Sequence, residues 1–114
     1  MTSGMKTVIY PVKDLDKAKA VYGSLLGVAP EMDEAYYVGY RVGGQDIGLD
    51  PHGHGKGMTG PVSYWHVDDI ERSLKGLFAA GAVEHQAAQD IGGGKLVASV
   101  TDADGNVIGL IQEP

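Results

Sequence analysis

The chain repeats one pattern twice. Residues 8–27 read VIYPVKDLDKAKAVYGSLLG and residues 63–81 read SYWHVDDIERSLKGLFAAG. Each segment is an apolar strand, an acidic residue suited to cap a helix, and an amphipathic helix that stops at a glycine. Strand-like sequence follows each segment and ends on Ile-Gly-Leu, at residues 47–49 and 108–110. The repeat predicts two copies of one βαβββ unit, and such self-similarity constrains the fold more than any other feature of the chain.

The two copies can be aligned residue by residue. Val12 matches Val67, 55 positions later, and Gly48 matches Gly109, 61 positions later. The offset grows from 55 to 61, so the second copy is six residues longer between these two positions. The glycine run at residues 92–94 is the simplest place for this insertion because glycine favours turns.

Length and composition limit the class of protein. With 114 residues, the chain suits one domain over residues 1–114, with units at about 5–50 and 61–112 and a linker at 51–60. It has no cysteine, which excludes disulfides and thiolate chemistry. The net charge of −6 and the scattered lysines and arginines argue against a nucleic-acid partner. No signal peptide or membrane span is apparent, so we expect a cytoplasmic protein; the order of residues 1–4 is left open.

Local patterns predict the elements. The expected strands are 6–12, a short edge strand within 29–33, 36–42, 45–50, 62–67, 83–90, 95–101 and 107–112. Asp14 is expected to cap the first helix, and Asp68 or Asp69 the second. The expected apolar helix faces are Leu15, Ala18, Tyr22, Leu25 and Leu26 in the first helix, and Ile70, Leu74, Leu77 and Phe78 in the second. Residues 51–60 are expected to be a flexible connection because they are rich in glycine and lack periodicity.

The helix starts and the turn before the last strand resemble those of a known family. PVKDLDKAKAVYGSLLG, VDDIERSLKGLFAAG and DADGNVIGL together resemble the vicinal oxygen chelate superfamily over residues 6–112. Its members include glyoxalase I, extradiol dioxygenases, fosfomycin-resistance enzymes and bleomycin-resistance proteins. The resemblance implies a single glyoxalase-like domain of the α+β class. In that fold two tandem βαβββ units form a cup-shaped mixed or antiparallel sheet with helices on its convex side.

The resemblance also indicates where a metal would be bound. In metal-dependent members, one position on the first and last strand of each unit supplies a ligand. The matching positions here are Thr7, Gly48, Val62 and Gly109, and none of them is His, Asp or Glu. The resemblance therefore implies that the superfamily's metal site is absent and that no cofactor is bound. This chain is then most similar to the bleomycin-resistance-type binding proteins.

The linker offers a weaker alternative for a metal. Asp50, His52 and His54 lie close together in the sequence Asp-Pro-His-Gly-His, and a His-x-His pair can bind a divalent ion. In a glycine-rich loop such a pair is more often a solvated polar segment, because neighbouring groups that orient the imidazoles are absent from the local sequence.

Strand alternation predicts which residues line the cup. Trp65 and Val67 are expected to pack in the core, whereas residues on the opposite face of that strand are expected to face the ligand. The expected ligand-binding residues are Thr7, Ile9, Gly48, Asp50, Val62, Tyr64, His66 and Gly109. Tyr36, Tyr37 and Tyr40 suit either stacking on a planar ligand or ordinary strand positions in a core or dimer contact. Arg41 suits either a carboxylate ligand or a surface ion pair.

Two functions from different classes remain open. The first is metal-independent binding of a small aromatic or cationic molecule, in the manner of bleomycin-resistance proteins and within a homodimer. The alternative is a glyoxalase-like enzyme, a lyase, isomerase or dioxygenase, that uses His66 and Tyr64 as acid and base or a non-standard metal site. For His66, the commoner role is that of an ordinary surface histidine at the end of a strand. A third possibility is a scaffold whose cup is filled by its own side chains.

Overall fold

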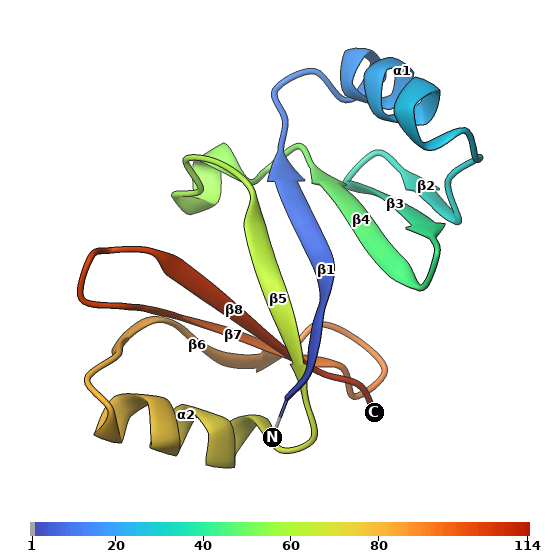
Figure 1. The fold of residues 1–114 in the computed structure, drawn as a ribbon. Coiled ribbons are helices and arrows are strands. Elements are labelled where there is room, and N and C mark those ends of the chain that lie inside the picture. The colour runs from blue at the N-terminus through green and yellow to red at the C-terminus, as the bar shows by residue number, and fades with distance from the viewer. Residues whose placement is uncertain (1) are drawn as a thin grey trace. The chain divides into compact units, whose positions relative to one another are not determined.

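The structure is a computed structural model that describes residues 2–114. They form two compact units. The N-terminal unit is Lys6–Val62, and the C-terminal unit is Ser63–Pro114 together with residues 2–5. Both are βαβββ units with mixed strand pairing, which confirms the predicted α+β class and internal repeat (Figure 1). Residues 51–60, expected to link the units, lie wholly within the N-terminal unit.

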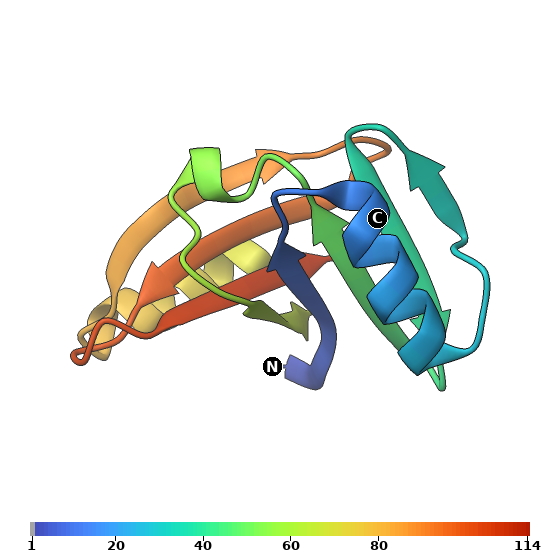
Figure 2. The ribbon, with the colours of Figure 1, turned by 90° about the horizontal axis from the view of Figure 1, so that it is seen from above.

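The N-terminal unit pairs its first strand with its last. Its elements are β1 (Thr2–Pro11, whose residues 2–5 belong to the other unit), α1 (Leu15–Leu26), β2 (Met32–Glu34), β3 (Tyr37–Val42) and β4 (Gln45–Asp50). The strand order is β2-β3-β4-β1, with β1 parallel to β4 and the other pairs antiparallel. The helix α1 runs alongside β4 (Figure 2). Gly43 and Gly44 both have positive φ and make the tight turn between β3 and β4.

The C-terminal unit has the same topology. Its elements are β5 (Val62–Val67), α2 (Ile70–Ala79), β6 (Val83–Asp90), β7 (Leu96–Thr101) and β8 (Val107–Gln112). The order is β5-β8-β7-β6, and β5 runs parallel to β8 as β1 runs parallel to β4. The helix α2 lies along β6, β7 and β8 (Figure 1). The start of β1 joins this unit, where the Thr2 hydroxyl donates to the His66 carbonyl oxygen at 2.7 Å.

Acidic residues start both helices, as predicted. The Asp14 side chain accepts a hydrogen bond from the backbone N–H of Lys17, and Asp69 does the same for Arg72. The second cap is thus Asp69 rather than Asp68. Gly27 ends α1 in the left-handed conformation, with φ of 69°. Such caps satisfy backbone groups that the first and last turns of a helix leave without partners.

Each unit has its own core. In the N-terminal unit the buried residues are Val12, Val38, Tyr40 and Leu49, and in the C-terminal unit they are Val67, Ile70, Leu74, Ala98, Val100 and Leu110. The predicted apolar helix faces are wrong at two residues. Leu25 is 76% exposed and Phe78 is 40% exposed, because both helices present a narrower face to their sheets than the apolar pattern suggests.

The short turn between β7 and β8 is held by one carboxylate. Asp102 accepts hydrogen bonds from the backbone N–H groups of Asp104 and Asn106, each at 2.9 Å, and from the Asn106 side-chain amide. These bonds hold the pKa of Asp102 below its ordinary value of 3.8, the Asn106 amide contributing most. This explains why the sequence DADGN forms a defined turn before the last strand.

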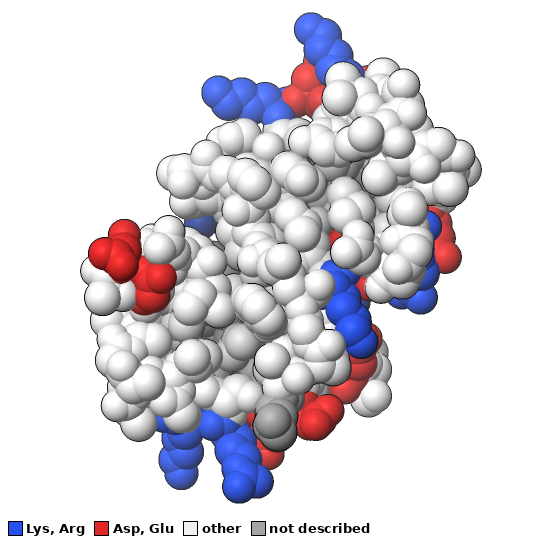
Figure 3. All heavy atoms as spheres, viewed as in Figure 1, with Lys and Arg blue, Asp and Glu red and all other residues white. Residues whose placement is uncertain are grey.

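Charged side chains of both signs lie on the surface of the protein (Figure 3). On the face shown in Figure 3, lysine and arginine side chains stand in separate groups, with acidic side chains among them. Within residues 2–114, neither helix is long and apolar enough to cross a membrane.

Candidate functional site

A tyrosine ring covers the glycine at the predicted metal-ligand position of the N-terminal unit. Gly48 pairs with Gly39 across β3 and β4, which makes Tyr37 its diagonal neighbour on the same sheet face. A Cβ atom built on Gly48 would collide with the Tyr37 hydroxyl and would lie 2.6 Å from the ring carbon that bears it. The phenol of Tyr37 therefore occupies the space that a ligating side chain at this position would need.

In the C-terminal unit a tyrosine ring also covers the corresponding glycine, but it comes from the first strand of the unit. Gly109 on β8 pairs directly with Tyr64 on β5. A Cβ on Gly109 would lie 2.5 Å from the Tyr64 ring and 2.8 Å from the backbone oxygen of Ser63. An aromatic ring laid over a strand glycine compensates for the missing side chain. Both units thus combine a glycine with a tyrosine at the predicted ligand position.

The predicted first-strand positions are both buried. Thr7 is 5% exposed on β1 and Val62 is 8% exposed on β5. Ile9 pairs with Gly48, and its equivalent in the repeat, Tyr64, pairs with Gly109. Ile9 and Tyr64, both predicted to line the ligand site, are therefore the direct cross-strand neighbours of the two glycines.

Asp50, a predicted ligand-binding residue, organises the residues that follow it. Its carboxylate accepts the backbone N–H of His52 at 2.8 Å and the Lys56 ammonium at 2.9 Å. These bonds fold the chain into a turn and a short 3₁₀ helix, His54–Lys56, which differs from the structureless connection expected there. A buried carboxylate with two such partners stabilises the loop that follows it.

The weaker metal alternative gains no support from this arrangement. His52 and His54 are exposed, and across residues 2–114 no three His, Asp or Glu side chains are grouped so as to hold an ion. The Asp50 oxygens accept hydrogen bonds from the backbone N–H of His52 and from the Lys56 ammonium, not from an imidazole ring.

The candidate acid–base pair lies on one strand. Tyr64 and His66 are two residues apart on β5 and are both partly buried. Alternation puts them on the same face, opposite Trp65 and Val67. Val67 is in the core as predicted, but Trp65 is 37% exposed, so its assignment to the core is wrong. The catalytic role of His66 and Tyr64 stays a prediction.

The other candidate ligand contacts divide among three roles. Tyr36 is 58% exposed, whereas Tyr40 is buried and its hydroxyl donates to the carbonyl oxygen of Lys19 at 3.4 Å. Arg41 donates from Nε to Asp46 at 2.9 Å and lies 3.6 Å from Glu31, which confirms the surface ion pair. The position of Tyr37 over Gly48 was not anticipated, although a tyrosine diagonal to a strand glycine is a recognisable signal once the register is known.

This architecture is the fold of the glyoxalase/bleomycin-resistance/dioxygenase superfamily, that is, of vicinal oxygen chelate proteins. A superfamily member from Vibrio splendidus 12B01 is 16% identical, with a TM-score of 0.71 over 94% of this chain and 97% of that chain. A protein described as NAD-dependent benzaldehyde dehydrogenase from Legionella pneumophila is 14% identical, with a TM-score of 0.76 over 95% and 98% of the two chains.

Metal-bound proteins share the fold. The Mn(II)-bound glyoxalase from Novosphingobium aromaticivorans is 19% identical, with a TM-score of 0.70 over 97% of this chain and 39% of that chain. At these identities the likeness establishes the fold alone. No protein-family model and no curated protein sequence matches this chain.

Proposed function

We propose that this protein binds a small aromatic or cationic organic molecule without a metal, on the sheet faces that carry Gly48 and Gly109. The observation behind this proposal is the tyrosine over each glycine. Phenol rings present flat, polarisable faces that attract planar rings and organic cations, while the same positions offer no carboxylate or imidazole to a divalent ion. The proposed contacts are the predicted set: Thr7, Ile9, Gly48, Asp50, Val62, Tyr64, His66 and Gly109.

The first test is the metal content of the purified protein. Tag-free protein purified without chelator is analysed by inductively coupled plasma mass spectrometry, beside the His52→Ala/His54→Ala double variant. We expect less than stoichiometric metal in both proteins. One divalent ion per chain would overturn the metal-free proposal, and its loss in the double variant would assign the ion to those histidines.

The second test uses a panel of planar aromatic cations and neutral aromatic compounds. A ligand at 100 times its Kd adds about 2.7 kcal/mol of stability, which raises Tm by on the order of 10 °C. We expect Tyr64→Ala and Tyr37→Ala to weaken this shift, and Tyr36→Ala, which removes an exposed ring, to leave it unchanged. A panel without any shift contradicts the proposal, as does a shift that both variants retain in full.

We also propose that the protein is a homodimer. Val21 and Leu25 on α1 are 65% and 76% exposed, and apolar side chains of this size are commonly covered at interfaces. Size-exclusion chromatography with light scattering should give twice the chain mass of 11.9 kDa. A mass of one chain at micromolar concentration contradicts this prediction.

A further inference from the structure

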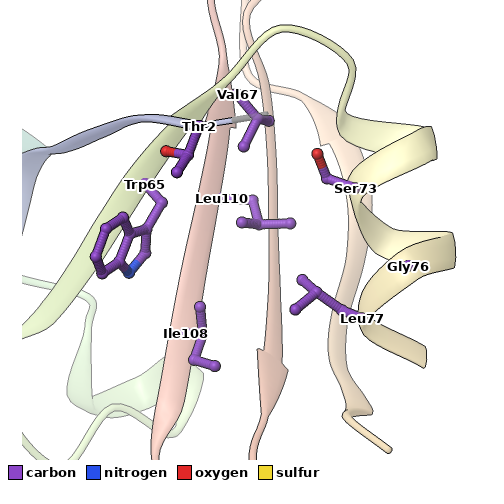
Figure 4. A pocket seen from close by; sticks show the side chains of 8 residues that line it. All are labelled: Thr2, Trp65, Val67, Ser73, Gly76, Leu77, Ile108 and Leu110. Carbon is purple, nitrogen blue, oxygen red and sulfur yellow. The ribbon is translucent and has the colours of Figure 1, made fainter. Parts of the chain in front are cut away.

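The C-terminal unit contains a pocket on the helix-facing side of its sheet. The cavity has a volume of about 520 Å³, within the range of small-molecule sites. It is lined by Thr2, Trp65, Val67, Ser73, Gly76, Leu77, Ile108 and Leu110 (Figure 4). Ser73 and Leu77 point from α2 toward the strands, and the indole of Trp65 borders the cavity from β5. By strand alternation this is the opposite face from Tyr64 and Gly109.

The internal repeat shows what fills this place in the other copy. With the offset of 55 residues, Trp65 corresponds to Tyr10 and Leu77 corresponds to Tyr22. In the N-terminal unit the rings of Tyr10 and Tyr22 are in contact, with centroids 4.9 Å apart. Burial raises the pKa of Tyr22, and the neighbouring Tyr10 adds to the shift, as expected for a phenol packed between helix and sheet.

The C-terminal unit keeps the aromatic residue of the strand but lacks the aromatic residue of the helix. Leucine is shorter than tyrosine, and a Cβ built on the neighbouring Gly76 would meet no atom within 4 Å. The volume that a helix tyrosine would fill is left open beside Trp65, which accounts for the 37% exposure of this indole.

We propose that this pocket is a binding site for a neutral, planar aromatic molecule of phenol size, which takes the place that the Tyr22 ring holds in the N-terminal unit. Every lining residue is uncharged, so the pocket favours a neutral ligand. The indole of Trp65 provides a stacking surface. The Ser73 hydroxyl, which stands where α1 has Ala18 and which makes no hydrogen bond within residues 2–114, offers one polar contact to a ligand hydroxyl.

Trp65 makes the proposal directly measurable because it is the only tryptophan in the chain. Titration with 4-methylphenol, the side chain of tyrosine as a free molecule, should change the Trp65 fluorescence saturably. The same compound should raise Tm. The site lies on the other sheet face from Tyr64, so Tyr64→Ala should leave this titration unchanged even if it abolishes the function proposed above.

The decisive variant is Leu77→Tyr, which copies the N-terminal unit. We expect its ring to occupy the space beside Trp65, to remove the saturable fluorescence change and to raise Tm in the absence of ligand. Lys75→Tyr is the matched control, because it places the same ring at an exposed position of the same helix, and it should retain binding. Gly76→Leu is a second filling variant that keeps the test valid if Leu77→Tyr does not fold.

Three outcomes overturn the proposal. The first is a fluorescence change that is only linear in 4-methylphenol up to its solubility limit. The second is saturable binding that both filling variants retain. The third is Trp65 emission that shifts with protein concentration and does not respond to 4-methylphenol, which would mean that a second copy of the chain covers the pocket.

Discussion

The two units share one topology but pack their helices differently. The helix α2 buries Ile70 and Leu74, whereas α1 buries none of its residues. The equivalent of Leu74 is Lys19, whose ammonium pairs with Asp33 at 2.8 Å. The N-terminal unit thus uses tyrosine rings and an ion pair where the C-terminal unit uses aliphatic side chains. In the C-terminal unit a pocket remains beside these side chains.

On the sheet face away from the helices the two units are alike, because each has a tyrosine ring over a glycine. The tyrosines come from different positions of the repeat. Tyr37 reaches Gly48 diagonally from β3, while Tyr64 covers Gly109 from the directly paired strand β5. Two unrelated positions in the repeat thus supply the same ring over the same glycine. The two units thus agree in the ring that covers each glycine and differ in the side chains packed between helix and sheet.

The largest predicted effect tests the helix comparison. Ile70 and Leu15 occupy equivalent positions, but Ile70 is fully buried and Leu15 only partly so. Ile70→Ala should lower the free energy of unfolding by roughly 2–5 kcal/mol, since it removes a large core side chain and leaves a cavity. Leu15→Ala should cost about 1 kcal/mol, because its partial burial contributes less. Urea denaturation of both variants measures the difference.

Equal losses for the two variants would mean that α1 is as tightly packed as α2 in solution. Lys17→Ala is the control for loss of a helix-surface side chain. Lys17 is exposed on α1 and lies outside the proposed dimer contact, so little change in stability is expected.

The second, smaller predicted effect is the stability lost when either tyrosine-covered glycine is replaced by alanine. Gly109→Ala and Gly48→Ala each insert a methyl group into filled space, which typically costs about 1–3 kcal/mol. Gly109→Ala should cost more because the new Cβ also meets the immobile backbone oxygen of Ser63 at 2.8 Å. At Gly48 the obstacle is the end of the Tyr37 side chain, which can rotate away. Thermal or urea unfolding gives the two values.

Double variants separate the ring from the backbone. Tyr37→Ala should restore most of the stability lost by Gly48→Ala, whereas Tyr64→Ala should restore only part of the loss in Gly109→Ala. Full rescue in both cycles would show that the Ser63 oxygen exerts no constraint.

Much of the fold could be predicted because its signals are local. The strands at 45–50, 62–67, 83–90 and 107–112 have the predicted bounds, since glycine turns and acidic caps delimit the elements beside them. The first strand is longer than expected because residues 2–5 add to it beside β5, through contacts such as the Thr2–His66 hydrogen bond. A contact so distant in sequence leaves no local signal.

The candidate site could be predicted only in part. The resemblance predicted Gly48 and Gly109 at the positions where metal-dependent members carry ligands, but the rings above these glycines depend on strand register and rotamers. The exposure of Trp65 has the same origin: alternation gives the face of a strand correctly, yet burial depends on whether an opposing helix supplies a large enough side chain. The turn after Asp50 escaped prediction because its glycines suggested flexibility, while one carboxylate holds it together.

The smallest predicted effect concerns the turns that close the two last hairpins. The N-terminal unit uses Gly43 and Gly44, which do not ionise, whereas the C-terminal unit relies on the Asp102 carboxylate. Hydrogen bonding lowers the pKa of Asp102 in the folded state, so its contribution is present above the unfolded-state pKa near 3.8 and is lost as pH falls through the lower folded value. Asp102→Asn should therefore be less stable than the parent at pH 7, and the two unfolding midpoints should converge as pH falls below the folded-state pKa of Asp102. A difference between the curves that is the same at every pH would show that the charge of Asp102 does not stabilise the turn, because the amide retains the shape of the side chain and removes only its ionisation.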